Sequence, residues 1–261
     1  METITSRDGT EIAFERRGSG PPLLLVHGTT ADHARWDRIS PRFEDDFTVV
    51  AMDRRGRGGS GDGPDYDLAR EAEDVAAVVD AMGQPVCLLG HSFGGICALE
   101  AALLTDAVVR MVLYEPPLPT GVGAMLEPGL VDRIQALIDE GRNEAALDLF
   151  ALEVVRMPES DIEAFRQSPM WPGRIRMAPT LPRELGFDHH YTFEPEKFHG
   201  LEVSTLILLG GDSPPIFRNA AEALQDALPN ADLVELPRQQ HIAMDTAPEL
   251  FAGEVLGFLR N

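Results

Sequence analysis

Residues 90–95, which read Gly-His-Ser-Phe-Gly-Gly, constrain the fold of this chain more than any other stretch. They follow the apolar run 85–89 and precede the helical spacing of residues 96–103. A buried strand therefore turns sharply into a helix, with Ser92 at the turn. The residues two before and two after Ser92 crowd each other, so glycine is favoured there. The turn would lift the Ser92 hydroxyl above the sheet, where the first N–H groups of the helix can stabilise an oxyanion.

Strand and helix patterns alternate along most of the chain. Apolar or alternating runs predict strands at residues 3–5, 12–14, 23–26, 47–52, 85–89, 108–114, 205–209 and 232–236. Helical spacing predicts helices near residues 68–82, 130–139, 144–155, 161–167, 220–228 and 250–259. This alternation is typical of an α/β fold with a doubly wound, mostly parallel sheet.

One part of the chain departs from the alternation. Residues 118–201 contain helical patterns separated by proline-rich pieces and no clear strand, so we expect a core of residues 1–117 and 202–261 with a helical insertion at 118–201. The insertion begins after the strand that follows Ser92, at the carboxyl edge of the sheet. Ligands bind at that edge in such sheets, so we expect the insertion to be a lid over Ser92.

Charge and composition exclude several classes of function. The net charge of −21 argues against binding to nucleic acid or to an anionic membrane surface. No apolar run approaches the ~20 residues of a membrane span, and the first residues do not resemble a signal peptide, so we expect a cytoplasmic protein. Cys87 and Cys97 read as small core residues, and neither a metal-binding spacing nor a phosphate-binding loop is present. We therefore expect no cofactor and no metal.

A serine hydroxyl needs a base to become a nucleophile near neutral pH. The chain has seven histidines. His241 is set apart because it lies between the last predicted strand and the last predicted helix, in a loop at the same sheet edge as Ser92. We therefore predict His241 as the base.

The base in turn needs an acid that orients its ring and stabilises the imidazolium. Two carboxylates follow predicted strands between Ser92 and His241 in the chain: Glu115 after residues 108–114, and Asp212 after residues 205–209. Both positions point to the active edge of the sheet. The residues alone leave the choice between them open.

Together, these motifs resemble the α/β-hydrolase superfamily. The resemblance rests on His27-Gly28, on the segment 53–60, on the Gly-x-Ser-x-Gly turn between strand and helix (the nucleophile elbow) and on the late His241. It implies a Ser-acid-His triad without a cofactor. It also implies an oxyanion hole made by the backbone N–H groups of Phe93 and Thr29.

The resemblance also bears on the acid. The family usually carries an Asp after the strand that follows the lid, in a loop reading Gly-x-x-Asp-Pro. In that register Ser213 takes the acid position, and Asp212 falls one residue short. A subset of the family, including some haloalkane dehalogenases, carries a Glu at the end of the strand after the elbow, where this chain has Glu115. The resemblance therefore favours Glu115, with Asp212 as the alternative.

Two further groups of residues are conspicuous. The segment 53–60 reads as a structural turn, whose arginines we expect to be solvated and to bond nearby carbonyls and acids. The predicted lid holds one polar cluster, residues 188–190, which we expect to be an exposed loop. Some of its large side chains should line an apolar pocket while others pack the lid, and these are Met125, Met157, Met170, Trp171, Met177, Phe187 and Tyr191.

The leading hypothesis is a serine hydrolase that cleaves a small, apolar carboxylic ester or related acyl compound through an acyl-enzyme. The same triad would also serve a cofactor-free perhydrolase of the haloperoxidase type, a lactonase or a carbon–carbon bond hydrolase. A rival from another class is a ligand-sensing receptor that turns over slowly. The sequence leaves the oligomeric state open, a homodimer included.

Overall fold

The computed structural model describes residues 1–63, 65–121, 126–157, 159–187 and 191–260. The chain forms two compact units. The first comprises Met1–Gly28, Asp32–Val122 and Thr192–Asn261, and the second comprises Thr29–Ala31 and Gly123–Tyr191. The second unit thus begins and ends inside the range 118–201 expected for the insertion. It also takes in three residues that follow the third strand.

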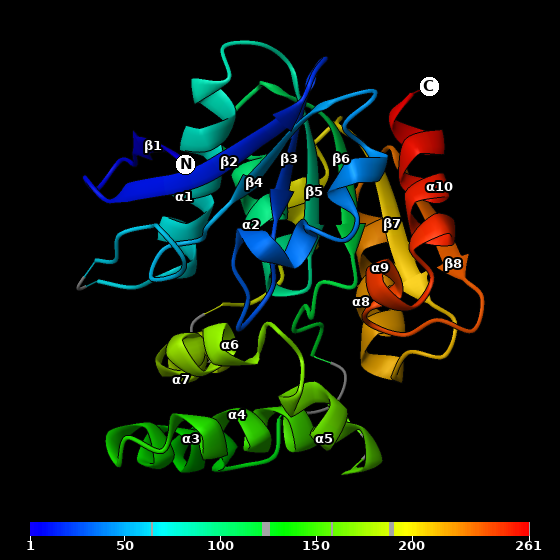
Figure 1. Cartoon of the computed structure of the whole chain (residues 1–261). Helices are drawn as coiled ribbons and strands as arrows, with labels where there is room; N and C mark the ends of the chain where they lie inside the picture. Colours follow the sequence, from blue (N-terminus) through cyan, green and yellow to red (C-terminus); the bar gives the residue numbers. More distant parts are fainter. Residues whose placement is uncertain (64, 122–125, 158, 188–190, 261) are drawn as a thin grey trace. The chain divides into compact units, whose positions relative to one another are not determined.

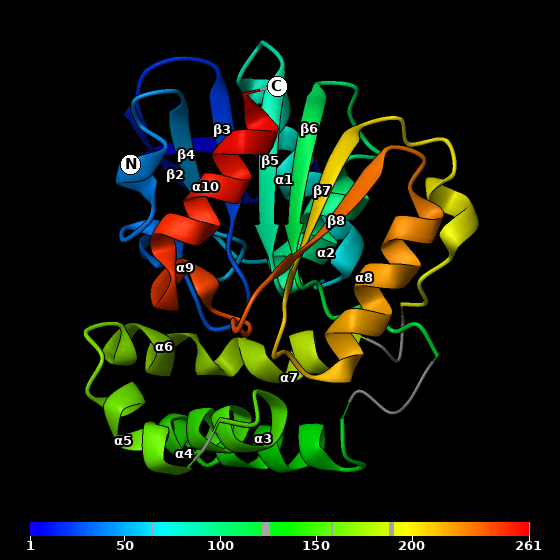
Figure 2. The same cartoon turned by 90° about the vertical axis from the view of Figure 1, so that its right-hand side faces the viewer.

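The described residues of the first unit contain a single eight-stranded sheet in the order β1-β2-β4-β3-β5-β6-β7-β8 (Figures 1 and 2). The strands are β1 (Glu2–Thr5), β2 (Glu11–Gly18), β3 (Pro22–Val26), β4 (Thr48–Met52), β5 (Val86–His91), β6 (Val108–Tyr114), β7 (Ser204–Gly210) and β8 (Ala231–Leu236). β1 pairs with β2 and β2 pairs with β4 in antiparallel orientation, whereas every pairing from β4 to β8 is parallel. The predicted fold class is confirmed.

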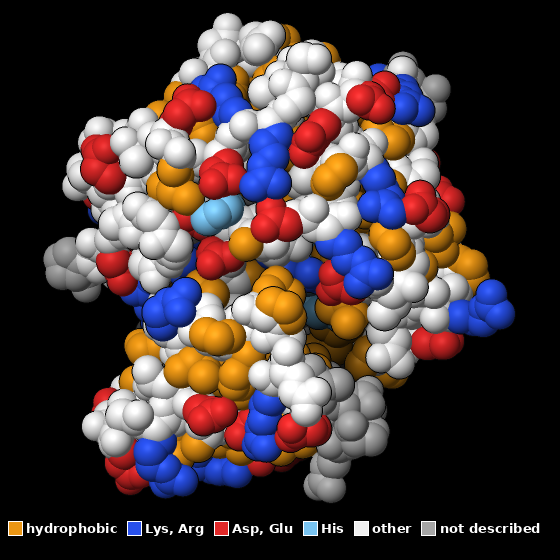
Figure 3. Space-filling view, in the orientation of Figure 1, with side chains coloured by type: hydrophobic (Ala, Val, Ile, Leu, Met, Phe, Trp, Pro, Cys, Tyr) orange, Lys and Arg blue, Asp and Glu red, His pale blue; other side chains and the backbone are white. Residues whose placement is uncertain are grey.

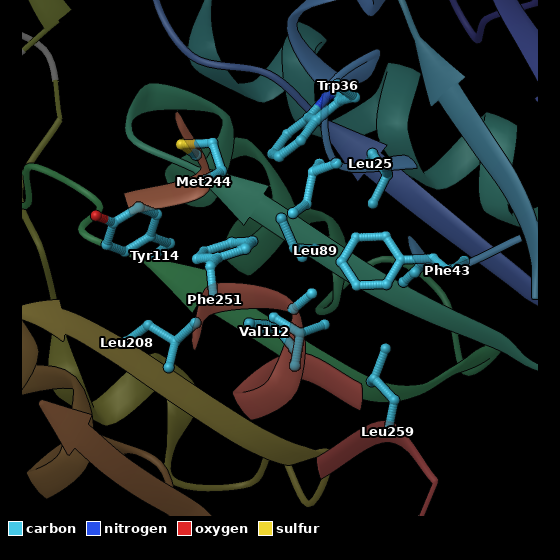
Figure 4. Close-up of a cluster of buried hydrophobic side chains, with 14 of the residues drawn as sticks. Leu25, Trp36, Phe43, Leu89, Val112, Tyr114, Leu208, Met244, Phe251 and Leu259 are labelled. Carbon is cyan, nitrogen blue, oxygen red and sulfur yellow. The ribbon is translucent and has the colours of Figure 1, made fainter. Parts of the chain in front are cut away.

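Helices cover both faces of this sheet. One face packs against the 3₁₀ helices η1 (His33–Trp36) and η2 (Ser40–Arg42) and against α9 (Ala243–Thr246) and α10 (Pro248–Leu259). Opposite them lie α1 (Leu68–Ala81) and α2 (Phe93–Ala101), which pack on each other, while α8 (Pro215–Ala227) runs along β7 and β8 (Figure 2). The core of the first face is drawn in Figure 4 and includes Leu25, Trp36, Phe43, Leu89, Val112, Leu208, Phe251 and Leu259.

The second unit is helical in its described residues. Its helices are α3 (Leu130–Asp139), α4 (Asn143–Leu149) with a π-helical continuation η3 (Phe150–Val154), α5 (Glu159–Arg166), α6 (Trp171–Met177), η4 (Ala178–Thr180) and α7 (Leu181–Leu185). It has an apolar core of its own, in which Leu130, Ile134, Leu147 and Trp171 are buried together. After it, the 3₁₀ helix η6 (Pro195–Phe198) returns the chain to the first unit.

The arginines of residues 53–60 correct our expectation of solvated charges. Arg54, Arg55 and Arg57 are at most 2 % exposed. Arg54 donates to both carboxylate oxygens of Glu71, at 2.6 and 3.0 Å, and Arg55 donates to both of Asp74, at 2.6 and 2.7 Å. The acids come from α1, so the turn after β4 is fastened to that helix by buried, bidentate ion pairs. We call these five residues the arginine cluster.

Across the described residues, no helix combines the length and the apolar character that crossing a membrane requires.

Candidate active site

The carboxyl ends of the parallel strands bring the predicted site residues to one edge of the sheet. His91 of β5 lies beside Tyr114 of β6, and Gly210 of β7 lies beside Leu236 of β8. The residues that follow these strand ends therefore emerge next to one another. Parallel strands share their carboxyl edge, which is why residues distant in the sequence meet there.

Ser92 forms the tight turn that the glycines predicted. It precedes α2 with φ 55°, in the left-handed region that costs a residue with a Cβ strain energy. A Cβ on Gly90 would lie 2.6 Å from the carbonyl oxygen of Gly94, which confirms the predicted crowding across the turn. The turn leaves Ser92 at the N-terminus of α2, whose first N–H groups have no partner within the helix.

The turn after β3 lies directly against Ser92. A Cβ on Gly28 would lie 2.9 Å from the Cβ of Ser92 and 3.4 Å from its Oγ. The neighbouring His27 is buried, donates from Nδ1 to the Gly28 carbonyl at 2.8 Å, and accepts at Nε2 from the Arg54 N–H at 3.1 Å. Burial, with the charges of Arg54 and Arg57, lowers the pKa of His27 well below its usual range. His27 is therefore a neutral structural link between the two turns.

The arginine cluster also reaches the elbow. The Arg54 guanidinium carbon lies 4.7 Å from the centre of the Phe93 ring, within range of a cation–π contact. Phe93 is 2 % exposed, so this contact holds the side chain of the residue whose N–H we predict as an oxyanion donor.

Glu115 and His241 are in direct contact. Nδ1 of His241 lies 2.7 Å from Oε2 of Glu115, whose side chain is fully buried, while that of His241 is 21 % exposed. An ionised carboxylate only accepts, so Nδ1 carries the hydrogen and Nε2 can take up a proton. The other carboxylate oxygen, Oε1, accepts from the Gly210 N–H at 2.7 Å.

Asp212 contacts the loop that carries His241 through its backbone and not through its carboxylate. Its side chain is exposed, and its backbone N–H donates to the carbonyl of Gln239 at 2.9 Å. Ser213, which takes the family's usual acid position in the sequence register, has a buried hydroxyl, and a Cβ on Gly210 would lie 2.6 Å from it. The carboxylate that contacts His241 is thus that of Glu115.

Three further aromatic side chains surround His241, and sequence reasoning did not single them out. The Phe217 ring stacks on the imidazole with centres 4.6 Å apart, and the His91 ring lies 4.7 Å away. The Tyr114 hydroxyl donates to the carbonyl of Gln240. Tyr114 directly precedes Glu115, so its place at the strand end was the one available signal; nothing local marks Phe217.

Thr29 belongs to the short segment that clusters with the helical unit. There Arg174 donates to the neighbouring Thr30, at 2.8 Å from its Oγ1 and 3.3 Å from its carbonyl oxygen. Thr30 has φ 54°, so this bond steadies a strained position. The role of Thr29 as an oxyanion donor stays a prediction.

The structure accounts for only some of the large side chains that we expected either to line a pocket or to pack the lid. Trp171 packs in the core of the helical unit and donates from its indole N–H to Glu144 at 3.1 Å. Residues 188–190, the predicted polar cluster, and Met125 lie outside the described residues. In the part of the chain that the structure describes, no three His, Cys, Asp or Glu side chains are grouped to hold a metal ion.

Comparisons with known proteins agree with the fold of the chain. The sequence model of the Alpha/beta hydrolase family matches residues 23–254. The crystal structure of an alpha/beta hydrolase from Sphaerobacter thermophilus DSM 20745 is 38 % identical, with a TM-score of 0.87 over 99 % of this chain and 100 % of that one. A non-heme haloperoxidase of Rhodococcus erythropolis is 26 % identical, and a bifunctional esterase/perhydrolase of Acinetobacter calcoaceticus is 27 % identical, each over the full length of both chains.

Proposed function

The chain is an enzyme of the alpha/beta hydrolase family, and on that premise we propose that it hydrolyses a carboxylic ester or a related acyl compound through an acyl-enzyme. The observation that carries the proposal is the 2.7 Å contact between Glu115 and His241, at the same sheet edge as the strained turn of Ser92. A nucleophile, a base and an orienting acid are the parts that acyl transfer needs.

In the proposed reaction, Ser92 Oγ attacks the substrate carbonyl while Nε2 of His241 takes its proton. The imidazolium that forms is stabilised by Glu115, and it returns the proton to the leaving alcohol. Water then attacks the acyl-enzyme with the same base. The N–H groups of Phe93 and Thr29 are the proposed oxyanion donors, each worth ~3 kcal/mol of transition-state stabilisation.

An apolar substrate is favoured by the surroundings of the base. Phe217 covers one face of the His241 ring, and the next residue, Ile242, is 44 % exposed. Exposed apolar area beside a catalytic group is typical of a surface that a ligand covers.

The proposal is tested with p-nitrophenyl acetate and butyrate. We expect a burst of nitrophenol followed by steady turnover, and an acyl adduct that intact-mass and peptide analysis locate on Ser92. Ser92→Ala should abolish both. Full activity in that variant would overturn the assignment, and binding of one ligand without repeated turnover would favour the receptor hypothesis.

A second activity is favoured by the haloperoxidase and esterase/perhydrolase relatives. Here hydrogen peroxide replaces water in the second step, so the acyl group leaves Ser92 as a peracid and the serine hydroxyl is restored. The assay is bromide oxidation by the peracid, in the presence of the ester and hydrogen peroxide. A rate equal to that of Ser92→Ala would exclude it.

A further inference from the structure

The loop that carries His241 joins β8 to α9 and has little regular structure of its own. Arg238 within it has φ 57°, and Gln239 is held through its carbonyl by the Asp212 N–H at 2.9 Å. A base must keep its ring in place to within fractions of an ångström during proton transfer. The loop therefore needs contacts close to His241 itself.

The hydroxyl of Tyr114 supplies contacts on both sides of His241. It donates to the carbonyl of Gln240, one residue before the histidine, and accepts from the N–H of Ala243, two residues after it, at 2.9 Å. One hydroxyl group thus binds the loop backbone both before and after His241.

Tyr114 is itself held rigidly. Its side chain is completely buried, and its ring packs on Phe251 of α10, with ring centres 5.3 Å apart. In Figure 4 the phenol lies at the margin of the apolar cluster, with its oxygen directed away from Leu89 and Phe43. Burial also raises the pKa of Tyr114, so the hydroxyl keeps the hydrogen that it donates.

The neighbours of Tyr114 complete the arrangement. His91 donates from Nε2 to the carbonyl of His241 at 2.8 Å, and Glu115, the residue after Tyr114, binds the imidazole itself. The end of β6 therefore controls the loop backbone through one side chain and the ring through the next. Successive side chains of a regular strand point to opposite sides. Tyr114 and Glu115 can reach the same loop because the chain turns sharply at Glu115, which has φ 46°.

We propose that Tyr114 is a positioning residue for the base: its hydroxyl, bonded to Gln240 and Ala243, fixes the loop that aligns His241 for proton transfer. The inference rests on the proposed function, since it assigns a role within the same site. The phenol acts through His241 and has no part in the chemistry.

The test is Tyr114→Phe, which removes the oxygen and keeps the ring packing. We expect kcat to fall on the order of 10- to 100-fold, because small misplacements of a catalytic group have that effect. KM should stay within about twofold, because ground-state binding is untouched. The matched control is Thr205→Val, which loses a hydroxyl bond of 2.9 Å to the Val203 carbonyl at the amino end of β7, away from the edge that carries the site. It should leave kcat unchanged.

Two measurements separate positioning from general destabilisation. Hydrogen exchange at the Ala243 amide should accelerate in Tyr114→Phe while amides of β5 and β6 keep their protection. The downfield proton resonance of the His241 Nδ1–H should broaden in the same variant. A wild-type kcat, or unchanged protection at Ala243, would overturn the inference.

Its failure can be told apart from failure of the proposed function. If Tyr114→Phe keeps full activity while Ser92→Ala and His241→Ala abolish it, the hydrolase assignment stands and the positioning role falls. If Ser92→Ala keeps full activity, both fall together.

Discussion

Glu115 is held at the site by two donors at once, the ring of His241 and the backbone of Gly210. Both carboxylate oxygens are occupied, which leaves the group little freedom to rotate. Its left-handed φ of 46° is a strained conformation that the surrounding bonds must maintain. Asp212, by contrast, contributes its backbone to the same loop and leaves its carboxylate in solvent.

We therefore expect substitutions of these two carboxylates to differ in their effect on catalysis. Glu115→Gln should lower kcat on the order of 10³- to 10⁴-fold, because an amide can neither accept the Nδ1 hydrogen as strongly nor stabilise the imidazolium. Asp212→Asn, the same change of carboxylate to amide one strand further on, should leave kcat within about twofold. Steady-state kinetics on a chromogenic ester measure both. A larger loss in Asp212→Asn would reverse our assignment of the acid.

At the scale of elements, the arginine cluster fastens α1 to the turn after β4. Glu71 lies fully buried between Arg54 and Arg57, and Tyr66 also donates to it. Burial opposes its ionised form, but the two guanidinium charges prevail and hold the pKa of Glu71 below its usual value. Glu71 is therefore ionised in the folded protein, although its side chain is fully buried.

Removing one partner of such a pair leaves a buried charge without compensation. We expect Glu71→Gln to lower the free energy of unfolding by about 3 kcal/mol. The matched control is Glu235→Gln, since Glu235 pairs with Arg218 at the surface, where side-chain exposures are 50 % and 43 %. That change should cost less than about 1 kcal/mol. Urea denaturation measures both, and equal costs would contradict the distinction.

A second link joins η1 to the same turn. Nδ1 of His33 lies 2.8 Å from Oδ1 of Asp53, which also accepts the His33 backbone N–H at 2.7 Å. The hydrogen bond to Asp53 raises the pKa of His33 above its usual value. A raised folded-state pKa means that protonation stabilises the fold.

The pH dependence follows from this sign. The contribution of His33 is complete below its unfolded pKa of about 6.5 and is lost as the pH rises through the higher folded-state value. The difference in unfolding free energy between the wild type and His33→Gln should therefore shrink between about pH 5.5 and about pH 8.5. Denaturation curves at the two pH values measure it. A difference that grows with pH would contradict the predicted sign.

At the scale of the whole molecule, the net charge of −21 opposes compaction. The face in Figure 3 shows Lys and Arg side chains interspersed among Asp and Glu, so part of the repulsion is already offset locally. Surface ion pairs such as that of Arg260 with Asp46 belong to this pattern. Asp and Glu side chains nevertheless outnumber Lys and Arg, 43 to 22, so a net repulsion remains.

Salt should therefore stabilise the protein. We expect the melting temperature to rise from low salt to about 0.5 M NaCl, because screening at a Debye length of a few ångströms removes long-range repulsion between carboxylates. The buried pairs of the arginine cluster are shielded from this screening. Differential scanning calorimetry with NaCl measures the shift, and a steady fall in melting temperature would show that surface attractions outweigh the repulsion.

Local chemistry determined a large part of this protein. The elbow at Ser92, the strands of the first unit and its helices α1, α2, α8 and α10 follow from the spacing of apolar residues and from steric requirements, which act over a few residues. α6 was missed because Pro172 and Gly173 look like breakers, yet proline is favoured in the first turn of a helix.

The tertiary structure decided the rest, because these features depend on residues far apart in the chain. Glu115 contacts His241 across 126 positions, and the residues alone did not separate it from Asp212; only the family resemblance favoured it. The burial of Arg54 depends on Glu71 facing it from another element. The bond from Tyr114 to the loop of His241 likewise exists only once β6 and β8 run parallel in one sheet, so that their carboxyl ends face the same way.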